Sequence, residues 1–150
     1  MADKSPRLAE FMPYRLSIAS NAVSDLIARE YQNRFGLKIA EWRVMAILGD
    51  VGSATQRELV TATRMDKVAV SRSVKALAAR ALIKRNPNAA DGRSQYLQLS
   101  KTGHELYDEI MPHAVDMEKR LLSALTNGEQ RALADLLDRL MVQADEIAEP

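Results

Sequence analysis

The sequence predicts a mainly α-helical fold that contains a helix-turn-helix, a small β-hairpin and long helices at both ends. Two observations lead to this fold class. Apolar residues recur at three- and four-residue steps over most of the 150 residues, which is the spacing of amphipathic helices. After the fourth helical segment, two short runs of β-favouring residues flank a loop rich in Asn, Asp, Pro and Gly, which favours a hairpin.

Composition limits the classes to which the chain can belong. Apolar residues make up 47% of the sequence and aromatic residues only 5%, so we expect one folded domain with a core of Leu, Ala, Val, Ile and Met. The absence of Cys excludes disulfides, thiolate metal sites and cysteine-based redox sensing. No apolar run approaches the ~20 residues that span a bilayer, and the N-terminus lacks the apolar stretch of a signal peptide. We therefore expect a cytoplasmic protein that does not contact a membrane.

Charge is distributed unevenly along the chain. Residues 55–102 hold ten Lys or Arg against three Asp or Glu, although the whole sequence has a net charge of only +1. This window is therefore basic, while the rest of the chain is acidic. A local positive field of this kind is typical of a DNA-binding surface.

Four of the predicted helices flank this basic window. The first runs from Pro13 to Phe35 and ends at Gly36, and the second runs from Ile39 to about Asp50. After the window, a long helix starts at Ser100 or Thr102, and a last helix follows the capping sequence Thr126-Asn127-Gly128-Glu129. The last helix carries a broad apolar face formed by Leu133, Leu136, Leu137, Leu140, Met141, Ala144 and Ile147.

Inside the window, two helices are joined by a tight turn. Thr55 and Glu58 have the spacing of a capping box, so they predict the start of a short helix. The turn is Thr63-Arg64-Met65, and Asp66 caps a second helix that runs to about Arg80. One face of this second helix is apolar, with Val70, Val74, Leu77 and Ala81. The opposite face is small, polar and cationic, as a face that enters a major groove requires; it consists of Lys67, Val68, Ser71, Arg72 and Lys75.

The two strand candidates are residues 82–85 and 96–99. The loop of about ten residues between them contains Asp91-Gly92-Arg93-Ser94, so the hairpin has a long basic tip. A hairpin of this kind beside a helix-turn-helix is a wing.

The whole layout resembles the MarR family of bacterial transcriptional regulators. The most specific part of the resemblance is the Asp-Gly-Arg-Ser wing at 91–94, followed after a strand by Leu-Ser-Lys-Thr-Gly at 99–103. The resemblance implies a homodimer, with residues 1–36 and 101–150 as a helical dimerisation region and residues 37–100 as the winged helix-turn-helix. It also implies a repressor that leaves a pseudo-palindromic operator when a small aromatic ligand binds where the two layers meet. Lys38 departs from the family pattern, because the family often has Thr or Ser at this helix cap.

Candidate DNA contacts follow from the faces and from the resemblance. Arg72 and Lys67 can reach base edges or phosphates, Ser71 can make a short contact, and Val68 offers a methyl surface to thymine. The flanking residues are better suited to phosphates; they are Thr55, Gln56, Arg57, Lys75 and Lys84. By the resemblance, Arg93 enters the minor groove and Asp91 orders the wing by pairing with a nearby Arg. Which side chain contacts a base is left open.

The ligand cleft of the family implies a second set of residues. It would lie among the first, second and fifth helices and would include Tyr14, Arg15, Ser17, Ile18, Trp42, Arg43 and Ala46. An Arg beside an apolar aromatic wall suits an aromatic carboxylate or its thioester. Trp42 can equally be a core residue, and either Arg can belong to a surface or interface ion pair. No metal and no cofactor is expected.

Three alternative functions fit the sequence less well. An enzyme is disfavoured because the chain has no Cys, no Gly-rich phosphate loop and no Gly-x-Ser-x-Gly motif. A metal-responsive regulator of the same fold would have to use His104 with Asp108, or His113 with Asp116 or Met117, yet no His-x-x-x-His pair is present. A helical protein-interaction module without DNA binding would not need the basic window.

Overall fold

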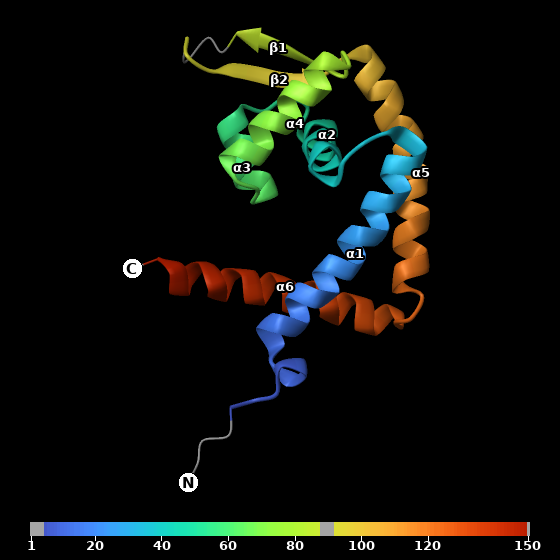
Figure 1. Ribbon diagram of the computed structural model, residues 1–150, viewed down its shortest axis with the longest axis vertical. Helices are drawn as coiled ribbons and strands as arrows, with labels where there is room; N and C mark the ends of the chain where they lie inside the picture. The colour runs from blue at the N-terminus through green and yellow to red at the C-terminus, as the bar shows by residue number, and fades with distance from the viewer. Residues whose placement is uncertain (1–4, 88–91, 150) are drawn as a thin grey trace. The chain divides into compact units, whose positions relative to one another are not determined.

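The structure is a computed structural model that describes residues 5–87 and 92–149 (Figure 1). The elements in chain order are η1 (Leu8–Glu10), α1 (Met12–Phe35), α2 (Ile39–Val51), α3 (Gln56–Thr63), α4 (Lys67–Ala79), β1 (Ile83–Pro87), β2 (Gln95–Leu99), α5 (Lys101–Leu122) and α6 (Asn127–Ala148). The predicted mainly helical fold with one small antiparallel hairpin is confirmed. Contacts divide the chain into two compact units, 1–108 and 109–150. In the part of the chain that is described, no helix combines the length and the apolar character needed to cross a membrane.

The ends of α1 follow local rules. Pro13 lies in its first turn, where a missing N–H costs nothing because that group has no helical partner. Gly36 ends the helix in the left-handed conformation, with φ 64°, which glycine adopts without steric cost. The guanidinium of Arg80 donates to the carbonyl oxygens of Gly36 and Phe35, at 3.1 and 3.2 Å. A cation at this end also complements the helix dipole.

The predicted helix-turn-helix is confirmed. The Thr55 hydroxyl accepts from the backbone N–H of Glu58 at 3.2 Å, and the Glu58 carboxylate accepts from the N–H of Thr55 at 3.3 Å. Arg64 ends α3 in the left-handed region, with φ 57°, and the Asp66 carboxylate caps α4 by accepting from Ala69 at 2.7 Å. Ala81 departs from the prediction because it lies beyond the end of α4, is exposed and has φ 57°, so it is no part of the helix's apolar face.

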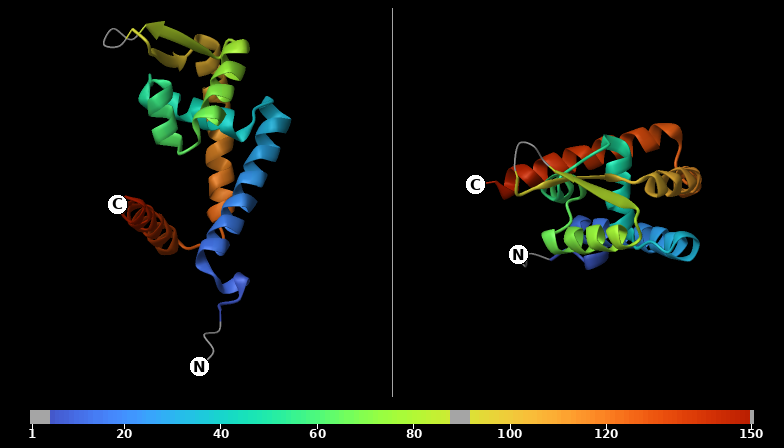
Figure 2. Two further views of the ribbon diagram at one scale, coloured as in Figure 1. Left: turned by 60° about the vertical axis from the view of Figure 1, so that its left-hand side comes forward. Right: turned by 90° about the horizontal axis from the view of Figure 1, so that it is seen from above.

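The hairpin is longer than the sequence predicted and carries an additional bridge. β1 and β2 are antiparallel, with Ile83 opposite Leu99 and Arg85 opposite Leu97. Ala54, just before α3, pairs with Leu97 through two backbone hydrogen bonds of 2.8 and 3.0 Å. The hairpin lies beside α3 and α4 in Figure 1 and in the left view of Figure 2. The bridge therefore fixes the start of α3 against the hairpin.

The core of the first unit lies among α2, α3, α4 and the hairpin. The largest side chains with less than 2% exposure include Leu48, Leu59, Leu77, Leu97 and Leu99. The α2 residue Glu41 is also buried, and its carboxylate accepts from the backbone N–H of Lys38 at 3.0 Å. Lys38 thus precedes α2 without a Thr or Ser side-chain cap, and Glu41 supplies the compensating contact.

The hairpin and α5 meet at a hydrogen-bonded joint. The Ser100 hydroxyl donates to the carbonyl of Ala81 at 2.6 Å and accepts from the N–H of Gly103 at 3.0 Å. The Ser100 N–H donates to the carbonyl of Leu82 at 3.0 Å. Gly103 packs directly on that carbonyl, and a Cβ at this position would overlap it.

The last helix buries none of its residues. Its N-terminus is closed by the predicted capping box, in which Thr126 and Glu129 satisfy each other's backbone N–H groups at 2.9 and 3.2 Å. Its large apolar side chains are 40–75% exposed; they are Leu133, Leu136, Leu137, Leu140, Met141, Val142 and Ile147.

Candidate nucleic-acid interface

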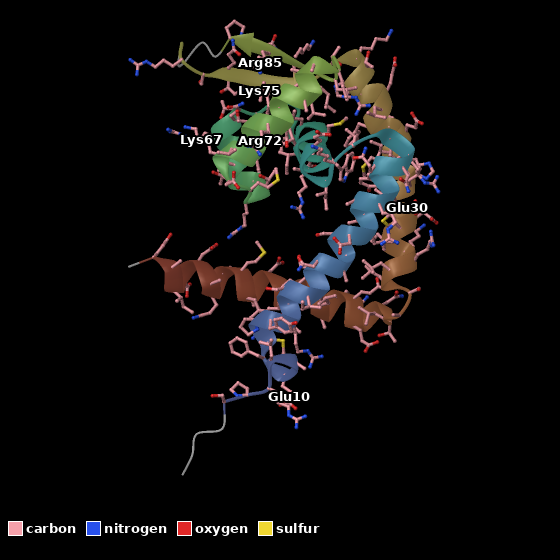
Figure 3. The ribbon with its side chains drawn as sticks, in the orientation of Figure 1. Glu10, Glu30, Lys67, Arg72, Lys75 and Arg85 are labelled. Carbon is pink, nitrogen blue, oxygen red and sulfur yellow. The ribbon has the colours of Figure 1, made fainter. Side chains whose placement is uncertain are left out.

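The α4 helix presents two opposite faces, as predicted. Val70, Val74 and Leu77 are at most 1% exposed, so they anchor the helix in the core. The other face points away from the core; Lys67, Val68, Arg72 and Lys75 are exposed and Ser71 is half-buried. The labelled cations of this face lie along α4 in Figure 3.

Ser73 is a buried polar residue on α4 that the sequence pattern did not single out. It is 4% exposed, and its hydroxyl donates to the carbonyl of Ala69 at 2.8 Å. A satisfied buried hydroxyl costs little stability. The residue therefore belongs to the support of the helix and not to its outer surface.

The start of α3 adds polar groups beside the hairpin. Arg57 is exposed, whereas Thr55 and Gln56 are half-buried. The oxygen of the Thr55 hydroxyl accepts the capping hydrogen bond, and its proton is left to donate outward. The three residues can thus offer a hydroxyl, an amide and a guanidinium to an anion.

An open cleft of about 700 Å³ separates the start of α3 from the wing. Its lining comes from α3, from both strands and from the wing, and consists of Thr55, Gln56, Arg57, Arg85, Gly92, Arg93, Ser94, Gln95 and Leu97. Arg93, the predicted wing-tip residue, is exposed. Asp91 lies outside the described residues, so its predicted pairing with an Arg stays a prediction.

Arg85 is the residue of this cleft that sequence reasoning missed. The sequence had suggested Lys84 as the cation of this strand, but Lys84 is opposite Gln98 and Arg85 is opposite Leu97. Neighbouring residues of a strand point to opposite faces of the sheet. The alternation of Ile83, Lys84 and Arg85 could have supplied the signal, because Ile83 had to face the core.

The predicted ligand residues do not form one pocket within a single chain. Tyr31 on α1 contacts Trp42 on α2, with ring centroids 5.3 Å apart. Ile18 precedes Tyr31 by about thirteen residues on the same helix, which corresponds to a distance of about 20 Å. The exposed set Tyr14, Arg15, Ser17 and Ile18 is therefore remote from the set Trp42, Arg43 and Ala46 of the same chain.

Trp42 belongs to an aromatic cluster. It stacks on Tyr107 of α5 at 5.9 Å and meets Tyr31 edge-on. The ring of Tyr107 also covers Gly49, where a Cβ would overlap it. Burial raises the pKa of Tyr31, so its phenol stays protonated at neutral pH. No local pattern marks Tyr107, because its partners Trp42 and Gly49 lie on a helix far away in the chain.

Within residues 5–87 and 92–149, no three side chains among His, Asp and Glu are grouped so as to hold a metal ion. The pairs that a metal-responsive regulator would have to use, His104 with Asp108 and His113 with Asp116 or Met117, are thus not part of a larger group of His, Asp and Glu in this part of the chain.

The sequence of this chain is similar to known protein families and to individual relatives. The sequence profile of the MarR family matches residues 35–94. The HTH-type transcriptional repressor NicR of Pseudomonas putida is 33% identical over 104 residues, which are 69% of this chain and 65% of NicR. The chain therefore matches slightly less than two thirds of that relative.

Two crystal structures share the fold over nearly their whole length. One is a MarR/EmrR family transcriptional regulator from Acinetobacter sp. ADP1, at 26% identity and a TM-score of 0.87, with 94% of this chain and 99% of the other covered. The second is a probable transcriptional regulator from Pseudomonas aeruginosa, at 29% identity and a TM-score of 0.77, with 89% and 99% covered.

Proposed function

Because this chain belongs to the MarR family, we propose that it is a ligand-responsive DNA-binding transcriptional regulator, acting as a repressor. The observation that carries the proposal is the outer face of α4. A helix held by a buried apolar face presents its cations, a small hydroxyl and an exposed methyl surface together. A major groove admits such a helix, and its base edges and thymine methyl groups complement these side chains.

The contacts divide by chemistry. Arg72 and Lys67 are the donors that reach base edges, with Ser71 and Val68 beside them, while Lys75 binds a phosphate. Thr55, Gln56 and Arg57 fix the register by binding phosphates next to the groove. Arg93 enters the neighbouring minor groove, where narrow A·T-rich segments attract a guanidinium.

The protein acts as a homodimer through residues 1–36 and 101–150. The support is the exposed apolar surface on α1 and α6 of one chain, where Leu16, Ile18, Leu136 and Leu140 are 40–49% exposed. Water-exposed apolar faces of this extent are typical of interaction surfaces. A two-fold dimer presents two α4 helices to half-sites about one helical turn apart, which makes the operator pseudo-palindromic.

The effector is a small aromatic acid or its thioester. Arg15 and Arg43 are exposed cations on α1 and α2 that can pair with a carboxylate, and Tyr14, Ser17, Ile18, Trp42 and Ala46 supply the remaining walls. Since the two halves of this set are about 20 Å apart in one chain, the α1 residues reach the pocket from the second subunit. The ligand lowers DNA affinity by binding the non-DNA arrangement of the dimer more tightly.

Selection from a random duplex library tests the DNA-binding function. We expect enrichment of an inverted repeat and loss of binding in an Arg72→Ala variant, by a factor of about ten to one hundred if the contact is bidentate. Glu146→Ala on α6 is the matched control and should bind like the wild type. A failure to enrich any duplex would refute the proposal.

The effector is tested on the same selected duplex. Benzoates, hydroxycinnamates and their thioesters are titrated into the complex, and the fluorescence of Trp42 reports direct binding. We expect release by at least one member of the panel. Hydrogen peroxide should leave the complex intact, because the chain has no Cys. Release by peroxide alone would contradict a small-ligand mechanism.

A further inference from the structure

The cleft between α3 and the wing has a chemical character of its own. Three guanidinium groups line it, from Arg57 on α3, Arg85 on β1 and Arg93 on the wing. None of the lining residues that the structure describes is an Asp or Glu. Cations that converge on one space repel each other unless an anion is present. The lining therefore favours an anionic ligand.

The register of the hairpin points Arg85 toward this space. Ile83, Leu97 and Leu99 are 2–5% exposed, so the face of the hairpin on which they lie is its inner face. Arg85 is opposite Leu97 and two residues from Ile83, so it is on the same face. The side chain is nevertheless exposed, because it lies over the open cleft and not over the core.

The walls of the cleft are held in place by the backbone. The two hydrogen bonds between Ala54 and Leu97 join β2 to the residue that precedes the α3 cap. The capping box of Thr55 and Glu58 then fixes the first turn of α3. Arg57 and Arg85 are thus carried by elements whose separation is fixed before a ligand binds, which lowers the entropic cost of binding.

We propose that Arg57 and Arg85 bind a phosphate of the DNA backbone in this cleft. The inference rests on the proposed function and adds Arg85 to the interface. A guanidinium pairs with phosphate oxygens through two parallel hydrogen bonds. The cleft is open to solvent, as a polymer that passes through it requires. The cations Lys67, Arg72, Lys75 and Arg85 follow one another from the start of α4 to the hairpin (Figure 3), which suits a continuous anionic backbone better than an isolated small anion.

The first test is the salt dependence of binding to the duplex selected above. Arg85→Ala should reduce the slope of log affinity against log salt by about 0.9 per subunit. For a dimer, the wild type should then lose about 12-fold more affinity than the variant between 50 and 200 mM salt. Lys38→Ala is the matched control, since it removes the same charge from an exposed residue at the start of α2, outside the cleft and outside the outer face of α4. Its slope should stay close to that of the wild type.

Equal slopes for the two variants would overturn the assignment, because a general loss of positive charge would then explain the effect. An unchanged slope in Arg85→Ala would also overturn it. Arg85→Lys keeps the charge, so its slope of log affinity against log salt should stay close to that of the wild type. Its affinity should be lower, because lysine lacks the two parallel donors of a guanidinium. A thermal melt of each variant identifies any that fails to fold, and Arg85→Gln then replaces Arg85→Ala.

The second test locates the phosphate. Duplexes that carry one neutral methylphosphonate per half-site are compared for the wild type and Arg85→Ala. At one position the substitution should weaken binding of the wild type about tenfold and weaken binding of Arg85→Ala clearly less, because only Arg57 then contacts that phosphate. If every position weakens both proteins equally, Arg85 does not contact a phosphate.

A third measurement separates DNA from a free anion as the occupant. If inorganic pyrophosphate raises the melting temperature of the wild type but not of Arg85→Ala, while both bind DNA with the same salt slope, the cleft is a small-anion site and the proposal is wrong. Absence of DNA binding by the wild type would instead contradict the proposed function. The two failures are therefore distinguishable.

Discussion

The winged region, residues 37–100, and the last helix, α6, bury their apolar side chains to very different extents. In the winged region Leu48, Leu59 and Leu77 are 0% exposed. In α6 the large apolar side chains are 40–75% exposed. Because burial supplies most of the favourable free energy of folding, the winged region carries its own stability. The sequence of α6 has an equally regular apolar face, and this face needs a second surface to cover it.

The largest expected effect comes from the core of the winged region. Leu77→Ala should lower the free energy of unfolding by about 3 kcal/mol, because the cavity lies under the α4 helix and cannot close fully. Urea denaturation measures the loss, which should not vary with protein concentration. The control is Val68→Ala on the same helix, where the side chain is 58% exposed and the change should stay within about 0.5 kcal/mol. Similar losses for the two variants would contradict the contrast between core and surface.

Substitutions in the apolar face of α6 should weaken association of the dimer more than they lower the stability of the fold. Leu140 is 48% exposed in one chain, so Leu140→Ala removes roughly 1 kcal/mol of burial per subunit if a partner covers it. We expect the dissociation constant of the dimer to rise, so that the variant becomes monomeric at concentrations at which the wild type is still a dimer. Sedimentation over a range of concentrations measures this change. Asp138→Ala lies on the polar face of the same helix and should leave the association unchanged. A stable monomer in the wild type would remove the basis of this prediction.

A smaller effect is expected where α4 is tied to α1. Arg80→Ala removes two charge-assisted hydrogen bonds to the end of α1. Since Arg80 is exposed, we expect a loss of about 1 kcal/mol in the free energy of unfolding. Arg80→Lys retains the charge but not the fork, so it should recover only part of this loss. Equal stability of Arg80→Ala and the wild type would show that water replaces both bonds without cost.

The smallest expected effect concerns the start of α6. The backbone N–H of Thr126, and then its hydroxyl, hold the pKa of Glu129 below its ordinary value of 4.5. A lowered carboxyl pKa stabilises the folded state above the ordinary value, and this contribution is lost as the pH falls through the folded pKa. Helical circular dichroism of the wild type should therefore decline slightly as the pH is lowered below about 4.5. Glu129→Gln should lack this component; an identical pH curve would contradict the role of the cap.

Local features of the fold could be predicted from the sequence. The capping boxes of Thr55 with Glu58 and of Thr126 with Glu129 depend on residues three positions apart, and both were correct. The stop at Gly36 likewise depends on one residue. Apolar periodicity separated the two faces of α4 because a rigid helix converts spacing directly into direction.

Features that depend on register or on distant contacts could not be predicted. Sequence reasoning named Lys84 and did not name Arg85, which lines the cleft, because neighbouring residues of a strand lie on opposite faces. A phosphate contact of Lys84 stays a prediction. The bridge between Ala54 and Leu97, which are 43 positions apart in the sequence, has no local signature. Tyr107 was missed for the same reason, because its contacts with Gly49 and Trp42 join helices that are far apart in the chain.

The contact at Gly103 couples the base of the hairpin rigidly to the first turn of α5. Gly103 packs on the carbonyl of Leu82, and Ser100 closes three further hydrogen bonds around the same point. Two elements move together when the contact between them leaves no free space, and at Gly103 there is no room even for a methyl group. A shift of the first turn of α5 must therefore move the base of the hairpin, and the glycine of Leu-Ser-Lys-Thr-Gly is the residue that makes the joint this close.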